Sequence, residues 1–444
     1  MFQHSQFAKL DLDLLQMKIY MEMKAYDAAQ DMYLMGKNTR LVDGFLSFYF
    51  LATNDYREDV PQYSDFKQYF GDDYDYADTI VAAALAGVSP YNELSHEQRV
   101  SIVVKTLQYV VMYMAASGSM YGAVTECIMR HQPPQRGSRP QPDSQQPNSP
   151  PPPNTGQRPR DRLRLSYDPW DIAAANLIGS LEGPDDNGNP SDPGYFFFGL
   201  GQLRCEEFGT CDKDGNAEVN KALITLLYAG QSQLDSGNCD ALKQTTEKIV
   251  DLLHVPLIQS TLSYAVANDG LVVGTQEASF AIGSIFARSI LPVINKVDTS
   301  AARVIERNME LQFERRPVFQ GFASVFEAFK DATPKLIGLN CEDVGRLNEM
   351  DVCGTPFILS IEKSLNRRSV LAIVIGANVV LLVLAFFIGF RCNRRLKFRQ
   401  EKIVITDDRI EQGEADTANG GSETTESFST KGKTEVLDHM GVVD

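Results

Sequence analysis

Apolar side chains recur at helical spacing along most of the first 350 residues of the chain. Residues 8–35 place Leu10 and Leu14 on one face and contain neither Pro nor Gly. Ser95 and Gln98 form a capping-box pattern, which typically starts a helix. Further helices are predicted at 167–182, 217–235, 240–268, 276–296, 300–313 and 318–331. Strand-like alternation is scarce, so the sequence predicts an all-α fold built from helical bundles.

A proline-rich stretch at 132–161 interrupts this helical region. It contains 10 of the 21 prolines of the chain together with many Gln, Ser and Arg residues, a composition typical of a linker. We therefore predict two lobes, a tyrosine-rich N-terminal helical lobe at 1–131 and a C-terminal helical lobe at 162–350. A juxtamembrane stalk is expected at 351–368.

The segment 369–390 runs for 22 residues without a charge. At 1.5 Å per residue such a helix covers about 33 Å, enough to cross a hydrocarbon core of about 30 Å. Three Lys or Arg residues precede it and six follow it, so we expect its C-terminal side to face the cytoplasm. The prediction is a type I single-pass membrane protein with a disordered cytoplasmic tail at 391–444. The first residues lack the features of a signal peptide, so we expect the sequence to begin inside a longer one.

The formal net charge of −16 is divided unevenly along the chain. The tail contributes −2, with 9 basic and 11 acidic residues, so −14 belongs to the part before the predicted span. Because binding to phosphate backbones requires a positive field, this acidity argues against a nucleic acid partner.

Six of the seven cysteines precede the predicted span, an even number that allows three disulfide bonds and 15 pairings. The disulfide candidates are Cys127, Cys205, Cys211, Cys239, Cys341 and Cys353. Cys205 and Cys211 are close enough in sequence to bridge locally, and the other pairings stay open. Cys392 lies just beyond the predicted span and is a candidate for palmitoylation, with a reduced cytosolic thiol as the alternative.

No catalytic motif is complete, so we expect a protein that is not an enzyme. His96-Glu97 begins an HExxH pattern, but Val100 stands where the second His is required. Thirteen of the 17 tyrosines lie between Tyr20 and Tyr121, and several alternate with Asp. Phenolate and carboxylate oxygens are hard ligands that suit a small, highly charged cation such as Fe(III). The alternative is a solvated loop with tyrosines at a lobe surface.

Short motifs in the second predicted lobe resemble those of a known family. They are Trp170-Asp171 through Gly183, Arg204-Cys205 through Cys211, Gly237-Asn238-Cys239, Val255 through Gln259, and Cys341 through Gly345. In this order and spacing they resemble the low-iron-inducible periplasmic protein family of algae. With the C-terminal span and short tail, the chain is most similar to the phytotransferrins, the iron-starvation-induced surface proteins of diatoms. The resemblance covers about residues 7–350 and the span.

This resemblance implies ferric iron binding at the cell surface for iron uptake, with carbonate as a synergistic anion. It also implies location in the plasma membrane and internalisation of the loaded protein by endocytosis. Iron would be released in an acidified, reducing endosomal vesicle. The candidate partners are therefore ferric iron, the membrane, the endocytic machinery and a ferric reductase.

The resemblance supplies no set of iron ligands, so the candidate site is inferred from the residues themselves. The expected iron ligands are Tyr74, Asp75, Tyr76 and Asp78 in the first lobe and Asp168, Asp171, Glu182 and Tyr195 in the second. Arg204 is expected to bind the anion. The structural alternatives are a helix cap for Asp168 or Asp171, a surface ion pair for Arg204 and a core position for Tyr195.

Two other classes of protein stay open. One is a non-catalytic adhesion or scaffold ectodomain that binds no metal. The other is a membrane-anchored helical hydrolase, against which the lack of a recognisable nucleophile or HExxH pattern counts. A visible charge-transfer band that appears with Fe(III) and needs bicarbonate distinguishes the iron receptor from both.

Overall fold

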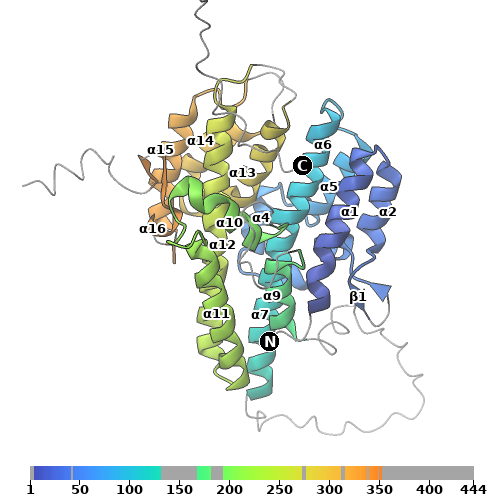
Figure 1. Ribbon diagram of the computed structural model, residues 1–444, viewed down its shortest axis with the longest axis vertical. Coiled ribbons are helices and arrows are strands. Elements are labelled where there is room, and N and C mark those ends of the chain that lie inside the picture. Colours follow the sequence, from blue (N-terminus) through green and yellow to red (C-terminus); the bar gives the residue numbers. More distant parts are fainter. Residues whose placement is uncertain are drawn as a thin grey trace, which may run out of the picture. The chain divides into compact units, whose positions relative to one another are not determined.

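The computed structural model of the chain describes residues 5–41, 44–131, 168–181, 194–272, 277–311, 316–336, 338–339, 341–348 and 350–352. The predicted linker at 132–161, the stalk beyond residue 352, the span at 369–390 and the tail at 391–444 lie outside the described residues. Glu182, Cys353 and Cys392 also lie outside them. The described part is mostly helical, which confirms the all-α prediction (Figure 1).

The described chain before residue 132 forms short helices around one long helical stretch. Its α-helices are α1 (Leu10–Glu22), α2 (Tyr26–Met35), α3 (Phe48–Thr53), α4 (Tyr63–Tyr69), α5 (Tyr76–Ala86), α6 (His96–Thr106) and α7 (Met112–His131). The 3-10 helices η1 (Ser5–Lys9) and η2 (Asp55–Asp59) and the π-helical turn η3 (Leu107–Val111) complete it. A two-residue antiparallel pair, β1 (Arg40–Leu41) and β2 (Gly44–Phe45), closes the loop after α2.

The described chain after residue 167 contains the longer helices. They are α9 (Pro169–Ile178), α10 (Phe197–Phe208), α11 (Glu218–Asp235), α12 (Cys239–Asn268), α13 (Ala278–Val297), α14 (Thr299–Met309), α15 (Phe322–Ala332) and α16 (Cys341–Val344). The 3-10 helix η4 (Thr333–Lys335) and the strand pair β3 (Arg346–Leu347) and β4 (Met350–Asp351) complete it.

Helix boundaries follow the local sequence closely, with one clear exception. Ser95 caps α6 by accepting from the backbone N–H of Gln98, whose side chain reaches back in turn, as the capping-box pattern predicts. The helical periodicity over 8–35 is divided between two helices, because α1 ends at Glu22 and α2 begins at Tyr26. Lys24 between them has a φ of +60°, a left-handed conformation that a continuous α-helix excludes.

One hydrophobic core runs through the described residues. The helix α7 packs against α9 and α12, and α6 packs against α13, so helices from both predicted lobes share this core (Figure 1). Trp170 on α9 is fully buried, and its indole N–H donates to the carbonyl of Leu227 on α11 at 3.0 Å. The structure thus displays no boundary between the two predicted lobes within the described residues.

Within the described residues, three helical stretches are long and apolar enough to cross a membrane by length and composition: His96–His131, Cys239–Asn268 and Ala278–Val297. In the fold 89 %, 72 % and 67 % of their most apolar windows is buried. Burial against other helices therefore accounts for their apolar character.

Disulfide bonds hold together elements of the described chain. Cys205 and Cys211 bridge across the end of α10, as their spacing predicts. Cys127 on α7 bonds to Cys239 at the start of α12, 112 residues later. Cys341 is also disulfide-bonded.

Candidate metal site

Three segments of the N-terminal half bring tyrosine and carboxylate side chains together around one arginine. Arg57 lies on η2, and Tyr74 and Asp75 immediately precede α5. After α4 the chain turns through Gly71 and Asp72, which have left-handed φ values of +75° and +63°. This turn returns the chain to η2, so residues 17 and 18 positions apart come into hydrogen-bond contact.

Arg57 is only 1 % exposed and organises this region. Its Nε donates to the carbonyl of Asn54 at 2.7 Å, and its Nη1 donates to the carbonyl of Tyr74 at 3.2 Å. Its Nη2 donates to Oδ1 of Asp75 at 2.8 Å. The guanidinium also lies 5.4 Å and 5.5 Å from the ring centroids of Tyr63 and Tyr74, within cation–π range. The buried guanidinium of Arg57 therefore holds the backbone of Tyr74 and the carboxylate of Asp75 close together.

A phenol–carboxylate pair lies in the same region. The hydroxyl of buried Tyr33, on α2, donates to Oδ1 of Asp78, on α5, at 2.7 Å. Burial raises the pKa of Tyr33, and the charge of Asp78 raises it further. Burial also raises the pKa of Asp78, and the nearby charges of Asp75 and Asp73 add to it, while Tyr33 and Arg57 act in the opposite direction. Tyr33 is thus a protonated phenol at neutral pH in the metal-free protein.

Tyr74 lies on the solvent side of the group, with 38 % of its surface exposed. Its hydroxyl donates to Glu58, and its carbonyl accepts from the hydroxyl of Tyr63 at 3.0 Å. Burial raises the pKa of Tyr63, which Arg57 partly offsets. We call the whole group the Arg57 cluster: Tyr33, Arg57, Glu58, Tyr63, Tyr74, Asp75 and Asp78.

Tyr76, the fourth of the first-lobe candidates, turns its ring into the core. Its side chain is 2 % exposed and stacks on Phe70, with ring centroids 4.7 Å apart. It also packs against Phe66 and Tyr63 in the core. Because the helix α5 begins at Tyr76, neighbouring residues point in different directions, which separates this ring from Asp75 and Asp78.

The described second-lobe candidates lie on other elements than the Arg57 cluster, at α9 and just before α10. Asp168 caps α9 by accepting from the backbone N–H of Trp170 at 2.9 Å, the structural role considered for it. Asp171 is buried on the same helix, and the carbonyl of partly buried Tyr195 accepts from Gln108 at 2.7 Å.

Arg204 is buried on α10 and faces α12. Its Nε donates to Ser260 Oγ at 3.1 Å, and its Nη1 donates to Glu207 at 2.9 Å and to Ser263 Oγ at 2.9 Å. Its guanidinium lies 5.3 Å from the ring centroid of Tyr264. Glu207 lies three residues after Arg204 on the same helix. The guanidinium predicted to bind the anion is therefore bound by side chains of α10 and α12.

The Gly179-Ser180-Leu181 motif has a structural role in the described residues. Asp11 on α1 is fully buried and accepts from the backbone N–H groups of Ser180 and Leu181 and from the hydroxyl of Ser180. Gly179 has a φ of +89°, and a Cβ there would clash with the carboxylate of Asp11. The motif therefore anchors the end of α9 to α1.

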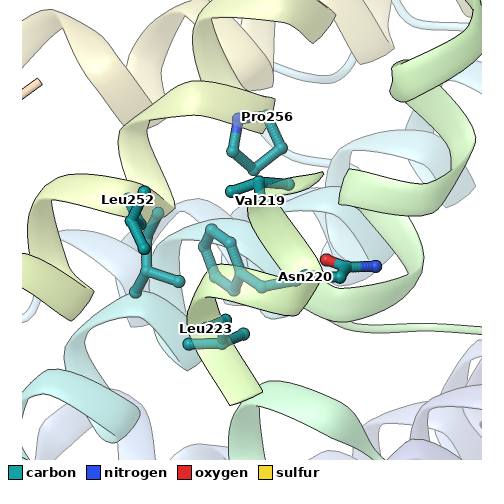
Figure 2. Close-up of a pocket in the computed structure, with 7 residues that line it drawn as sticks. Val219, Asn220, Leu223, Leu252 and Pro256 are labelled. Atoms are coloured by element: carbon teal, nitrogen blue, oxygen red, sulfur yellow. The ribbon is translucent and has the colours of Figure 1, made fainter. Parts of the chain in front are cut away.

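Two further features have plain structural roles. His254 is 3 % exposed, and its Nε2 lies 3.0 Å from the hydroxyl of Tyr113 in the core. An apolar pocket lies where α10, α11 and α12 meet, and Figure 2 shows its lining with Val219, Leu223, Leu252 and Pro256 labelled. Its lining has no carboxylate, imidazole or thiol, so it does not resemble a metal site.

Sequence reasoning missed part of the Arg57 cluster. Arg57, Glu58, Tyr33 and Tyr63 are separated from Tyr74 by 11 to 41 positions and share no motif with it. One available signal was a single Arg within the acidic stretch 55–59, because a cation among carboxylates and tyrosines is a natural centre for them.

The chain was compared with protein-family models, with curated proteins and with solved structures, and none of them matches it.

Proposed function

We propose that the chain binds ferric iron for uptake at the cell surface, anchored in the plasma membrane by the segment 369–390. The observation that carries this proposal is the Arg57 cluster, in which three phenols and three carboxylates surround one buried cation. Hard oxygen ligands of this kind suit a small trivalent cation. The two-lobed arrangement inferred from the sequence belongs to this proposal as well.

Within the cluster, Tyr33, Tyr74, Asp75 and Asp78 are the proposed ligands. The hydroxyl of Tyr33 donates to Asp78 at 2.7 Å, and burial raises the pKa of both groups. Iron must therefore displace the phenol proton of Tyr33 and compete with protons for Asp78, so its affinity falls as the pH falls. This dependence suits release in an acidified endosome.

The anion requires a second cation beside the iron ligands, and Arg57 is the arginine that contacts them. In the structure its N–H groups donate to Asp75 and to the carbonyls of Asn54 and Tyr74. We propose that Arg57, rather than Arg204 as first inferred from the residues, holds the carbonate, because a synergistic anion must contact the same iron as the phenolates. Carbonate would supply two further oxygen ligands to the metal.

The test is a titration of the purified full-length chain with Fe(III), with and without bicarbonate. A visible tyrosinate-to-iron charge-transfer band that requires bicarbonate is the expected result. If no band appears at neutral pH and the iron is lost on dialysis, the proposed function is wrong.

Variants locate the site. Tyr33→Phe and Tyr74→Phe should each weaken the band, whereas Tyr69→Phe is a matched control. The hydroxyl of Tyr69 donates to Glu306 at 3.0 Å, so it also loses a phenol–carboxylate hydrogen bond, but outside the Arg57 cluster. Equal effects from all three variants would leave the function standing and reject this site.

A second matched pair tests the anion. Arg57→Lys is expected to weaken the bicarbonate dependence of the band, because a lysine lacks the planar fork that binds an oxyanion through two N–H groups. Arg204→Lys should leave that dependence unchanged. If Arg204→Lys weakens the bicarbonate dependence and Arg57→Lys does not, Arg204 is the residue that binds the anion.

A further inference from the structure

A second group of metal-ligating side chains lies at the far end of α7. The ligand atoms of Cys127, His131 and Cys239 all lie within 4.8 Å of one another. Cys127 and His131 are four residues apart on α7, so they lie on one face of that helix. Cys239 is the first residue of α12 and is bonded to Cys127 in the oxidised protein.

The imidazole of His131 is already oriented for a metal. Its Nδ1 lies 3.0 Å from the carbonyl oxygen of Cys127, and because a carbonyl only accepts, Nδ1 carries the proton. The lone pair is therefore on Nε2, the usual arrangement of a metal-binding histidine. Nε2 faces the turn before Cys239: a Cβ on Gly237 would come within 2.5 Å of it. Because residue 237 is a glycine, with a φ of +69°, no Cβ occupies the position beside Nε2.

We propose that reduction of the Cys127–Cys239 disulfide converts this group into a zinc site with two thiolates and the Nε2 of His131 as ligands. This proposal does not rest on iron binding. Thiolate and imidazole ligands favour Zn²⁺, whereas the oxygen ligands of the Arg57 cluster favour a hard cation. Water would occupy the fourth position, as in other sites with three protein ligands.

The chemistry balances with a dithiol as the reductant. Two electrons and two protons pass from the dithiol, which closes to its own disulfide, and the bond between the sulfurs of Cys127 and Cys239 breaks to give two thiols. Zn²⁺ then displaces both thiol protons to solvent. Cys239 lies at the N-terminus of a helix of 30 residues, where the helix dipole favours the thiolate.

The backbone already has the spacing that the metal requires. With Zn–S bonds of about 2.3 Å in tetrahedral geometry, the two sulfurs lie about 3.8 Å apart. The Cα atoms of Cys127 and Cys239 are 5.6 Å apart, so rotation of the two side chains is enough to reach this separation. Cys239 is partly exposed and His131 is exposed, which gives a reductant and a metal ion access.

The test uses the full-length chain, reduced with a phosphine that does not bind the metal and titrated with Co²⁺ in the absence of oxygen and iron. We expect a sulfur-to-cobalt charge-transfer band at one equivalent of Co²⁺, which Zn²⁺ abolishes. The oxidised chain should give no such band. A band of equal intensity in the oxidised chain would overturn the proposal.

Three variants assign the band. Cys127→Ser with Cys239→Ser should abolish it, and Cys205→Ser with Cys211→Ser, which removes the other disulfide with two described partners, should leave it unchanged. His131→Ala keeps the oxidised disulfide and should weaken Co²⁺ binding at least about tenfold. The proposal is wrong if the first double variant keeps the band or if His131→Ala binds Co²⁺ as tightly as the parent.

Reduction itself can loosen the fold, so circular dichroism of the reduced chain is the accompanying measurement. If helix content falls on reduction, Zn²⁺ should restore it in the parent chain and fail to restore it in the Cys127→Ser, Cys239→Ser variant. Loss of helix that Zn²⁺ does not reverse in the parent chain also rejects the proposal.

Discussion

Replacing Arg57 by Met tests the physical basis of the candidate metal site. The substitution keeps much of the apolar volume of the side chain and removes its three described hydrogen bonds. Arg57 is 1 % exposed, so water does not take over those interactions. We expect a loss of folding stability and a loss of iron affinity, for separate reasons.

The loss of stability can be worked from the contacts. Hydrogen bonds from a charged donor contribute about 1.5–3 kcal/mol each, and two of them reach the carbonyls of Asn54 and Tyr74. The pair with Asp75 adds about 0–1 kcal/mol, because that carboxylate is 46 % exposed and solvent screens it. Removing a buried guanidinium also relieves its desolvation cost. The net decrease in the free energy of unfolding should be about 2–4 kcal/mol.

The loss of iron affinity has an electrostatic origin. Burial raises the pKa of Tyr33, Tyr63 and Asp78, and the positive charge of Arg57 acts to lower all three pKa values. Without that charge Tyr33 and Asp78, the two proposed ligands among these groups, hold their protons more strongly, and the carbonate loses the cation proposed to bind it, so iron binding weakens. Arg57→Lys keeps a charge but cannot direct donors to three diverging acceptors, so it should fall between Met and Arg.

Urea denaturation followed by circular dichroism measures the stability, and the visible titration measures the iron affinity. The control is Arg130→Met, because Arg130 is 66 % exposed and pairs with Glu126 at 2.9 Å on the surface of α7. That change should cost less than about 1 kcal/mol. The reasoning fails if Arg57→Met costs no more than Arg130→Met, or if it destabilises the protein without weakening iron binding.

Three further outcomes follow from particular contacts. Asp11→Asn should lower the free energy of unfolding in urea by about 2–4 kcal/mol, because the buried carboxylate accepts three hydrogen bonds; a loss below about 1 kcal/mol contradicts this role. Gly230→Ala should cost at least about 1–3 kcal/mol in the same assay, because a Cβ there overlaps the Trp170 ring, and unchanged stability contradicts that packing. Ferric affinity should fall as the pH falls, because protons compete with iron for Asp78, whose pKa burial raises; Asp78→Asn should flatten this profile, and an unchanged slope excludes Asp78 as a ligand.

The fold was predictable where apolar periodicity was continuous. The predicted helix at 240–268 differs by one residue from α12, because a long apolar face and a preceding Gly-Asn turn define both its course and its start. The break at Lys24 was not predictable, because neither Gly nor Pro marks it, and the packing of α1 against α2 across it involves contacts that local propensity does not describe. Linker composition suggested two lobes, but composition says nothing about whether the helices on either side share a core.

The candidate site was predictable only in part, for a geometric reason. Tyr74, Asp75, Tyr76 and Asp78 are adjacent in sequence, but the start of α5 sends Tyr76 into the core and leaves Asp75 and Asp78 beside Arg57 and Tyr33. Adjacency therefore identified a segment that takes part in the Arg57 cluster, but not which of its four side chains points into the core. The partners on η2 and α2 needed the tertiary structure, because 17 and 45 positions separate them from the residues that they contact.

The two proposed metal sites should act independently, and this makes their failures distinguishable. Tyr113, near the start of α7, stacks on Phe66 in the core beside the Arg57 cluster, with ring centroids 5.4 Å apart. Cys127 lies 14 residues further along that helix, a distance of about 21 Å at 1.5 Å per residue. At this distance two unit charges interact by less than about 1 kcal/mol at an effective dielectric constant of about 20, so charge added at one site has little effect at the other. Cys127→Ser with Cys239→Ser should therefore change ferric affinity by less than about twofold, measured by the visible titration, once circular dichroism shows that the variant is folded. A larger change would mean that the disulfide, through α7, positions the iron ligands.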